Sequence, residues 1–472
     1  MNTHRSLVNA AGIPDLNTFL GCDLDKEMST ILSNQNNKIL RVGICGLGTV
    51  GGGTLLLLEQ NAATITARAG CPIRVTHVAT RTPKPDLCAR ISVLGQDPFA
   101  VTSDPEVDVV VETIGGYDVA LEVIKRALKN GKHVVTANKA LIAERGNELF
   151  ALANTNEVTL AFESAVAGGI PIIKALREGL AANEIEWLAG IINGTGNFIL
   201  SEMSAGQSEF SETLQKAQDL GYAEADPTFD VEGIDAAHKL TIMSSIAFGI
   251  PLQFEKAYTE GISGISPTDI SFAEELGYRI KHLGITRKTD RGVEMRVHPA
   301  LIPRTRLLAN VDDVGNAVMV HGNFVGSTLY SGPGAGARAT ASAVVADLID
   351  LARDKVADVK TPIRPALGSI EADSSLDVLP IEQIEVGYYL KIPVLDKQGV
   401  MAKLSAVLQG KGISIEAIIQ KKPITSETVP IVILTQVAME YELNAALEAL
   451  AKLDEVTGPV TRIRVEPFDG EA

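Results

Sequence analysis

Apolar residues form short runs that alternate with glycine turns and helical stretches over the first third of the chain. Residues 39–60 contain the run ILRVGIC, a glycine cluster and then TLLLLEQ, which predict a strand, a turn and a helix. Residues 72–81 and 107–116 predict two further strands, and residues 117–138 predict a helix with a glycine stop and another strand. Strands and helices that alternate at this spacing predict a parallel α/β sheet of the Rossmann type.

The pattern loosens after about residue 163, where β-like runs become longer. Residues 185–200 predict a strand, a glycine-bearing turn and a helix, and residues 233–249 predict another helix. The segments 293–303, 316–322 and 326–336 alternate in the manner of strands and carry turn residues at their ends. We expect a mixed α+β domain here, with an antiparallel or mixed sheet and helices on one face.

Order returns in the last ~90 residues, after a stretch rich in proline, serine and acidic residues that predicts a linker. Residues 386–467 contain six segments in the order β-α-β-β-α-β, which is the ferredoxin-like arrangement. The first 38 residues are polar and weakly periodic, and they predict an extension that is partly disordered.

The composition is that of a globular protein with more than one domain. The chain has 472 residues, of which 46% are hydrophobic and 21% are charged. A net charge of −16 and an aromatic content of 4% disfavour binding to nucleic acid or to an anionic membrane. No run approaches the ~20 apolar residues of a membrane span, and the N-terminus lacks the apolar core of a signal peptide. We therefore expect a cytoplasmic protein.

The first candidate site is the motif GLGTVG, whose glycines Gly46, Gly48 and Gly51 lie between a predicted strand and a predicted helix. In this context the first glycine permits a tight turn, the second lets a pyrophosphate approach the backbone, and the third lets the helix pack on the strand. The next strand ends without the acidic residue of NAD-selective sites and is followed by Arg81, which can bind a 2′-phosphate. The motif predicts a dinucleotide, with NADP favoured over NAD, although Arg81 could also be an exposed loop cation.

Three further segments carry residues that could bind a ligand or an ion. Lys139 follows a buried strand, where ligands of parallel sheets bind, although a surface lysine is the alternative. The segment 163–171, ESAVAGGIP, could hold a cation through Glu163 and closely spaced carbonyls, but a tight turn without an ion explains it equally well. The segment 193–197, NGTGN, could bind a carboxylate or carbonyl oxygen through its amides and Thr195, or could be an N-capped turn.

The stretch 221–239, GYAEADPTFDVEGIDAAHK, carries five acidic residues. Asp235 and Lys239 are four residues apart and share one face of a predicted helix, which alone is typical of a solvated surface. The preceding loop brings Glu224 and Asp226 toward that helix, and carboxylates at this density need a neutralising cation or ammonium group. An amino-acid substrate supplies such a group, so the stretch favours a substrate site.

Taken in this order, the segments resemble the homoserine dehydrogenase family from about Arg41 to the C-terminus. The resemblance is carried by GLGTVGGG, TANKA, ESAVAGGIPII, GIINGTGNFIL, GYAEADPTFDVEGIDAAHK and GPGAGARATASAVVADL. It implies NAD(P)-dependent interconversion of L-homoserine and L-aspartate 4-semialdehyde in threonine, methionine and isoleucine biosynthesis. The terminal segment resembles an ACT domain, which implies inhibition by threonine near Asp396, Gly399 and Val400.

The resemblance also implies roles for individual residues. Lys239 would be the general acid at the reacting oxygen, Asp235 would bind near the reacting hydroxyl, and Lys139 would orient the transfer. The implied substrate-binding residues are Glu224, on the homoserine ammonium group, together with Asp230, Thr195 and Tyr222. The implied cofactor-binding residues are Gly46, Leu47, Gly48, Thr49, Val50, Gly51, Arg81, Thr113, Lys139, Gly221 and Gly334. The implied sodium site uses Glu163, Val166, Gly168 and Ile170.

The resulting division of the chain has five parts. These are an extension (1–38), a dinucleotide-binding domain (39–162 plus 334–360), a catalytic and dimerisation domain (163–333), a linker (361–384) and an ACT regulatory domain (385–472). The chain is expected to form a homodimer or homotetramer. Another NADP-linked amino-acid or hydroxy-acid dehydrogenase would explain the glycine motif but not the acidic stretch. A non-catalytic regulator would have no need of Lys239.

Overall fold

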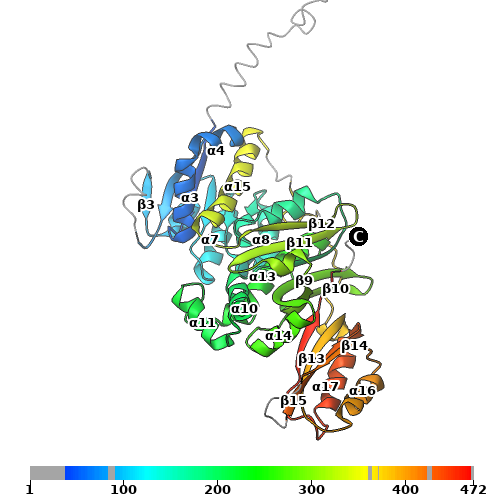
Figure 1. Ribbon diagram of the computed structural model, residues 1–472. Coiled ribbons are helices and arrows are strands. Elements are labelled where there is room, and N and C mark those ends of the chain that lie inside the picture. Colours follow the sequence, from blue (N-terminus) through cyan, green and yellow to red (C-terminus); the bar gives the residue numbers. More distant parts are fainter. Residues whose placement is uncertain (1–37, 83–90, 360–363, 370–371, 422–427, 469–472) are drawn as a thin grey trace, which may run out of the picture.

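Two sheets organise the part of the chain that the computed structural model describes, which comprises residues 38–82, 91–359, 364–369, 372–421 and 428–468. The first sheet lies at one end of the elongated molecule, and the second runs from the middle toward the other end (Figure 1). Almost all of the predicted extension lies outside the described residues. No helix among the described residues is long and apolar enough to cross a membrane.

The first sheet has six parallel strands in the order β3-β2-β1-β4-β5-β6. The strands are β1 (Leu40–Cys45), β2 (Ile73–Ala79), β3 (Val93–Gly95), β4 (Val109–Glu112), β5 (His133–Thr136) and β6 (Leu160–Ala161). This is the strand order of dinucleotide-binding sheets, in which the ligand crevice opens where the order reverses, between β1 and β4. The predicted Rossmann-type sheet is confirmed.

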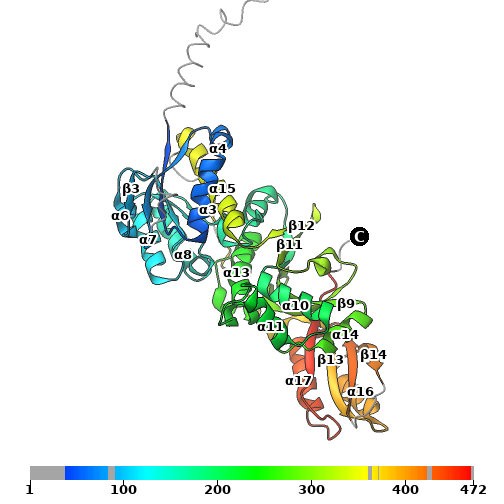
Figure 2. The same ribbon diagram turned by 60° about the vertical axis from the view of Figure 1, so that its left-hand side comes forward.

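Among the described residues, six helices accompany this sheet, and one of them comes from a distant part of the chain. They are α3 (Thr49–Gln60), α4 (Ala62–Ala69), α6 (Pro98–Ser103), α7 (Asp118–Lys129), α8 (Lys139–Thr155) and α15 (Ala337–Val356). Helix α15 lies beside α3 in both views (Figures 1 and 2), and its Val344 and Leu348 share a buried cluster with Val42 and Leu55. The first sheet is therefore covered by helices from two separate segments of the chain; the predicted domain boundaries stay a prediction.

The middle part joins five antiparallel strands to helices, as the predicted mixed α+β pattern requires. The strands follow the order β12-β11-β7-β9-β10 and are β7 (Ile185–Ile191), β9 (Tyr278–Thr289), β10 (Gly292–Pro303), β11 (Gly315–Gly322) and β12 (Gly326–Pro333). The main helices are α10 (Gly194–Gly206), α11 (Phe210–Asp219), α12 (Thr228–Val231), α13 (Ile234–Phe248) and α14 (Pro267–Glu275). A two-residue strand, β8 (Tyr258–Thr259), adds to β10.

The C-terminal unit has the predicted β-α-β-β-α-β order. Its elements are β13 (Glu385–Leu395), α16 (Val400–Gly410), β14 (Ile415–Gln420), β15 (Thr428–Thr435), α17 (Glu440–Leu450) and β17 (Thr461–Val465), with a short β16 (Ala438–Met439). The strand order β17-β13-β15-β14 is ferredoxin-like. Strand β17 also pairs with β10, where Ala300 lies opposite Arg464. The sequence separates these two parts by a linker, whereas the structure joins them into one eleven-stranded sheet.

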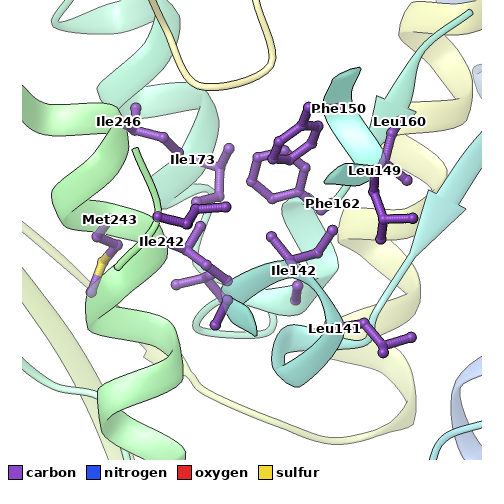
Figure 3. Close-up of a cluster of buried hydrophobic side chains, with 14 of the residues drawn as sticks. Leu141, Ile142, Leu149, Phe150, Leu160, Phe162, Ile173, Ile242, Met243 and Ile246 are labelled. Atoms are coloured by element: carbon purple, nitrogen blue, oxygen red, sulfur yellow. The ribbon is translucent and has the colours of Figure 1, made fainter. Parts of the chain in front are cut away.

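A hydrophobic core fixes helix α8 against helix α13 (Figure 3). Ile142 from α8 and Ile242 from α13 belong to the same cluster and are 0% exposed. Burial of each such side chain contributes about 1.5–3 kcal/mol to folding, so the two helices are held firmly together. Because Lys139 begins α8 and Lys239 lies on α13, this core also sets the distance between the two lysines.

Candidate active site

A cleft with a volume of about 660 Å³ opens between the nucleotide-binding part and the helices of the middle part. Its lining includes Lys139 from the first part and Asn193, Asp230, Asp235 and Lys239 from the second. A second pocket of about 430 Å³ continues it along the ends of β4 and β5, and the two pockets share Val50, Ala137 and Lys139. Together they offer space for a dinucleotide head and a small substrate.

The glycine motif has the geometry that a dinucleotide requires. Gly46 has φ +97°, and a Cβ atom built on Gly51 would lie 2.0 Å from the Gly46 carbonyl oxygen. A Cβ atom on Gly48 would meet no described atom within 4 Å, so there is open space above this residue. No side chain among the described residues caps α3, which begins at Thr49, so its first N–H groups are available to a phosphate. The chain therefore fits a pyrophosphate at this turn.

The other predicted cofactor residues lie either at the glycine turn or at the adenosine side of the sheet. Thr113 donates from Oγ1 to the Gly46 carbonyl oxygen at 2.7 Å and holds the turn against β4. Leu47 is 2% exposed and can offer a ligand its backbone alone, whereas Val50 lines both pockets. Arg81 is exposed two residues beyond β2, at the edge where the adenosine half of a dinucleotide binds in such sheets. Its assignment stays a prediction.

Two lysines converge on one buried carboxylate in the cleft. Asp235 is 5% exposed, and its Oδ2 lies 2.6 Å from Lys239 Nζ while its Oδ1 lies 3.1 Å from Lys139 Nζ. Burial opposes the ionisation of Asp235, but the charges of Lys239 and then Lys139 outweigh it and hold the pKa of Asp235 below its ordinary value. Lys239 also donates to the Ile192 carbonyl oxygen at 2.7 Å. The predicted pair of Asp235 and Lys239 is thus a buried site and not a surface pair.

Asn193 links the two acidic residues of the cleft. Its Nδ2 donates to Asp230 Oδ1 at 2.8 Å and to Asp235 Oδ2 at 2.9 Å. Its Oδ1 accepts from the Gly196 N–H at 2.8 Å and caps helix α10. Burial raises the pKa of Asp230, and the neighbouring Asp235 charge adds to this rise. The motif NGTGN alone predicts no role for Asn193 beyond a turn, although its N-cap position is a signal that fixes its orientation.

The predicted substrate residues do not all reach the cleft. Thr195 Oγ1 donates to the Tyr222 carbonyl oxygen at 2.7 Å, and the Tyr222 ring packs edge-on against Phe198 at 5.0 Å. Thr195, Tyr222 and Asp230 line the cleft, as do Gly221 and Gly334 from the cofactor prediction. Glu224 is exposed, and it is not among the described residues that line the cleft.

The Glu163 carboxylate is already engaged by the backbone. It accepts from the N–H groups of Ile173 at 3.0 Å and Lys174 at 2.9 Å, while the Glu163 N–H donates to Asp347 at 3.0 Å. Gly168 lines the cleft, and both Ala167 and Gly168 have positive φ angles. No group of three His, Cys, Asp or Glu residues in the described part of the chain is arranged to hold a metal ion. A cation in this loop would therefore depend on backbone carbonyls.

Comparison with known proteins identifies the family. Residues 46–163 match the family model "Homoserine dehydrogenase, NAD binding domain", and residues 171–349 match the model "Homoserine dehydrogenase". A homoserine dehydrogenase of Pseudomonas aeruginosa is 57% identical over 433 residues, which cover 92% of this chain and 100% of that protein. The chain belongs to the homoserine dehydrogenase family.

Solved homoserine dehydrogenase structures have the same fold. The structure of a homoserine dehydrogenase from Thiobacillus denitrificans has a TM-score of 0.87 at 55% identity and covers 91% of this chain and 99% of that chain. A hyperthermophilic archaeal homoserine dehydrogenase in complex with NADPH has a TM-score of 0.57 at 27% identity, over 66% of this chain and 97% of that chain. This chain is accordingly an NAD(P)-dependent oxidoreductase that acts on the CH–OH group of homoserine, which confirms the prediction.

The buried pair of Glu163 and Asp347 makes the stability of this homoserine dehydrogenase fold depend on pH. Burial, and then the charge of Asp347, raise the pKa of Glu163 to about 7, and burial raises the pKa of Asp347 to about 6. The folded state therefore binds protons more tightly than the unfolded chain, and this contribution to stability is lost as the pH rises from about 4 to about 7. Replacement of Glu163 by glutamine should reduce that loss by about 1–3 kcal/mol.

Urea unfolding of the wild type and of Glu163→Gln at about pH 5 and about pH 7.5 measures this effect. The wild type should lose more free energy of unfolding between the two pH values than the variant does. The same pH dependence in both proteins would show that this carboxylate pair does not titrate in the folded state at these pH values.

Proposed function

We propose that Lys239 is the acid–base residue that interconverts L-homoserine and L-aspartate 4-semialdehyde. The observation that carries this proposal is the position of its ammonium group, which lies in the wall of the cleft and is held by Asp235 and the Ile192 carbonyl oxygen. NADPH held at the turn formed by Gly46, Gly48 and Gly51 would supply a hydride to the aldehyde carbon. As negative charge develops on the aldehyde oxygen, Lys239 gives that oxygen a proton, and in the oxidative direction its amine takes the hydroxyl proton.

The charges around Lys239 suit this reaction. Asp235 is shared by two ammonium groups, so this three-residue cluster carries a net positive charge. A positive cluster in a partly closed cleft stabilises an oxygen that becomes negative. We assign Lys139 the role of orienting the reacting groups, because it lines both pockets. The Asn193 bridge holds Asp230 and Asp235 at a fixed separation while this happens.

We assign the homoserine ammonium group to the acidic loop. Asp230 already lines the cleft and pairs with Asn193, whereas Glu224 is exposed on the preceding loop. Glu224 would reach the substrate only if residues 221–227 moved toward the cleft when substrate binds. Replacement of Glu224 should then raise the KM for homoserine more than the KM for NADP.

The defining experiment is the formation of NADPH by the purified protein in the presence of L-homoserine and NADP. A panel of other hydroxy acids and hydroxy amino acids distinguishes this activity from that of another dehydrogenase. Oxidation of one of those compounds without any homoserine-dependent NADPH formation would overturn the proposal. We place the reaction in the cytoplasm, in the biosynthesis of threonine, methionine and isoleucine, in keeping with the acidic composition and the family.

The preference for NADP is assigned to Arg81. Replacement of Arg81 by alanine should lower kcat/KM for NADP about 10- to 100-fold, the loss expected for a charge-assisted bond to the 2′-phosphate. It should leave kcat/KM for NAD nearly unchanged, because NAD lacks that phosphate. Arg74 lies exposed near the opposite end of the same strand, so Arg74→Ala is the matched control. Equal losses with both cofactors would contradict the assignment.

We propose that threonine inhibits the protein through the C-terminal unit, which we interpret as an ACT domain. The turn before α16 supports this: Gly399 has φ +84°, and no described side chain caps the helix that begins at Val400. Because β17 pairs with β10 at Ala300 and Leu301, deletion of this unit would also expose that part of the β10 edge, so a point variant is the better test. Asp396→Ala should weaken inhibition by threonine and leave the uninhibited rate intact; unchanged inhibition would contradict the site.

Two further proposals concern assembly and ions. We propose a homodimer or homotetramer, which is supported by Phe324, 91% exposed, in the turn before edge strand β12. Light scattering after size-exclusion chromatography would show a monomer if this is wrong. We also propose a sodium ion at the backbone carbonyls of Val166, Gly168 and Ile170, near Glu163. Replacement of sodium by a larger organic cation should lower activity, and no change would count against the ion.

A further inference from the structure

A group of charged side chains, of which Arg464 and Glu440 are buried and Arg462 and Glu260 are partly exposed, joins the C-terminal unit to the middle part of the molecule. Arg464 on β17 is 0% exposed, and it binds Glu440 of α17 at 2.6 Å and Glu260, just after β8, at 2.8 Å. Arg462 binds the same two carboxylates at 2.7 and 3.3 Å. The group is balanced, with two positive and two negative side chains. Its only partner from the middle part among these four is Glu260.

Glu260 is held in this group as an ionised side chain. Burial opposes its ionisation, but Arg464 outweighs burial and lowers the pKa of Glu260. The Tyr258 hydroxyl donates to the same carboxylate at 2.8 Å. Charge-assisted bonds of this kind are short and directional, and the loss of one partner leaves the others buried without compensation. The Glu260 side chain is therefore bonded to both arginines of β17.

The backbone of Glu260 contacts the turn that precedes helix α13. Its carbonyl oxygen accepts from His282 Nε2 at 3.0 Å, and a Cβ atom built on Gly233 would lie 3.2 Å from that same ring nitrogen. Two residues further on, the Ile262 N–H donates to the Val231 carbonyl oxygen at 3.0 Å. Gly233 has φ +83° and directly precedes α13, which carries Asp235 in its first turn.

We propose that Glu260 is a positioning residue that couples the C-terminal unit to helix α13 and so to substrate binding. The side chain of Glu260 is tied to β17 and α17, and its backbone is tied to the turn before Asp235. The same segment also contacts the residues just before α13: a Cβ atom on Gly261 would lie 2.3 Å from the Glu232 carboxylate. Packing this tight transmits a displacement of one side to the other. The effect of an effector bound at the C-terminal unit rests on the threonine proposal above. The effect of Glu260 on substrate binding does not depend on that proposal.

A second link between the same two parts supplies the matched control. Asp269 on α14 is 0% exposed and accepts from the Tyr389 hydroxyl at 3.1 Å and from Lys391 at 2.8 Å, both on β13. Asp269 lies on α14, whereas Glu260 follows β8, and the side-chain hydrogen bonds of Asp269 run to Ser266 and β13 and include neither Gly233 nor Asp235. Asp269→Asn therefore weakens the junction without touching the proposed connection.

The test compares Glu260→Gln and Asp269→Asn with the wild type. Coupled sites typically change one another's affinity by about 5- to 150-fold, so Glu260→Gln should raise the KM for homoserine at least about fivefold. The KM for NADP should stay within about twofold, and Asp269→Asn should change neither KM by more than that. A homoserine KM that is unchanged in Glu260→Gln, or raised equally by both variants, would overturn the proposal.

Amide hydrogen exchange provides an independent measurement. Homoserine with NADP should slow exchange at residues 461–465 in the wild type and in Asp269→Asn, but not in Glu260→Gln, because coupling is reciprocal. Absence of this effect in the wild type would also overturn the proposal. If Glu260→Gln does not fold, Tyr258→Phe removes one bond to Glu260 and should raise the homoserine KM in the same direction by a smaller factor; an unchanged KM in that variant would then overturn it.

Inhibition by threonine provides a third measurement. If threonine inhibits the wild type, Glu260→Gln should need at least about fivefold more of it for half inhibition, while Asp269→Asn should not. If threonine does not inhibit the wild type, the proposal of threonine regulation fails, and the homoserine KM and exchange measurements still decide the coupling.

Discussion

Replacement of Lys239 by methionine is expected to lower kcat for homoserine oxidation by about 10²- to 10⁴-fold, the contribution typical of a positioned acid or base. The Lys239 ammonium group lies in the wall of the cleft, and methionine keeps most of the side-chain volume while removing the charge. The Kd for NADPH should change little, because Gly46, Gly51 and Thr113 form the nucleotide turn at a different place. Initial rates and a fluorescence titration with NADPH measure both quantities.

A control must show that the variant still folds, because Asp235 loses one of its two positive partners. Without Lys239, Asp235 keeps Lys139 at 3.1 Å, so the buried carboxylate retains one positive partner. Thermal denaturation should therefore still show a folded protein. A folded variant that keeps more than about a tenth of the wild-type kcat would exclude Lys239 as the general acid. A protein whose wild type oxidises no alcohol at all would instead support a non-catalytic regulator.

Replacement of Asn193 by aspartate is expected to lower kcat/KM for homoserine by about 10²- to 10³-fold. The introduced carboxylate would still offer an oxygen to the Gly196 N–H and keep the cap of α10, but it would lack the N–H groups that reach Asp230 and Asp235. Three carboxylates would then face one another, and two charge-assisted hydrogen bonds, each contributing about 1.5–3 kcal/mol, would be lost. Steady-state kinetics over a range of homoserine concentrations measures the loss.

Asn193→Ser separates the two causes. Serine keeps a capping oxygen and adds no charge, so this variant reports the loss of the bridge alone and should lose less activity than the aspartate variant. Both variants should keep the wild-type Kd for NADPH. Aspartate and serine variants within about threefold of the wild type would show that the bridge has no part in turnover.

Local patterns account for the parts of this molecule that could be predicted from its sequence. The turn at residues 46–51 and the pair of Asp235 and Lys239 are encoded within a few residues, so spacing alone points to them. The β-α-β-β-α-β order of the C-terminal unit follows from the same kind of periodicity. Each of these features depends on residues that are close together in the sequence.

The features that sequence reasoning missed depend on contacts between distant segments. The Asn193 bridge requires α12 and α13 to lie beside the start of α10, and the role of Glu260 requires β17 to lie beside β8. The exposed position of Glu224 likewise depends on how its loop packs and not on its neighbours in sequence. The pairing of β17 with both β10 and β13 could not be read from its alternation, since the pattern shows that a strand exists but not which strands it joins.

The order in which the chain is made gives the late elements α15 and β17 a further consequence. A growing chain on the ribosome lacks Val344 and Leu348 when the six strands of the first sheet have already emerged, so part of one face of that sheet stays uncovered until α15 is made. Strand β10 is also made well before β17, and until β17 pairs with Ala300 and Leu301 this part of the β10 edge is open to other chains. Chains that end before β17 are therefore expected to aggregate or be degraded.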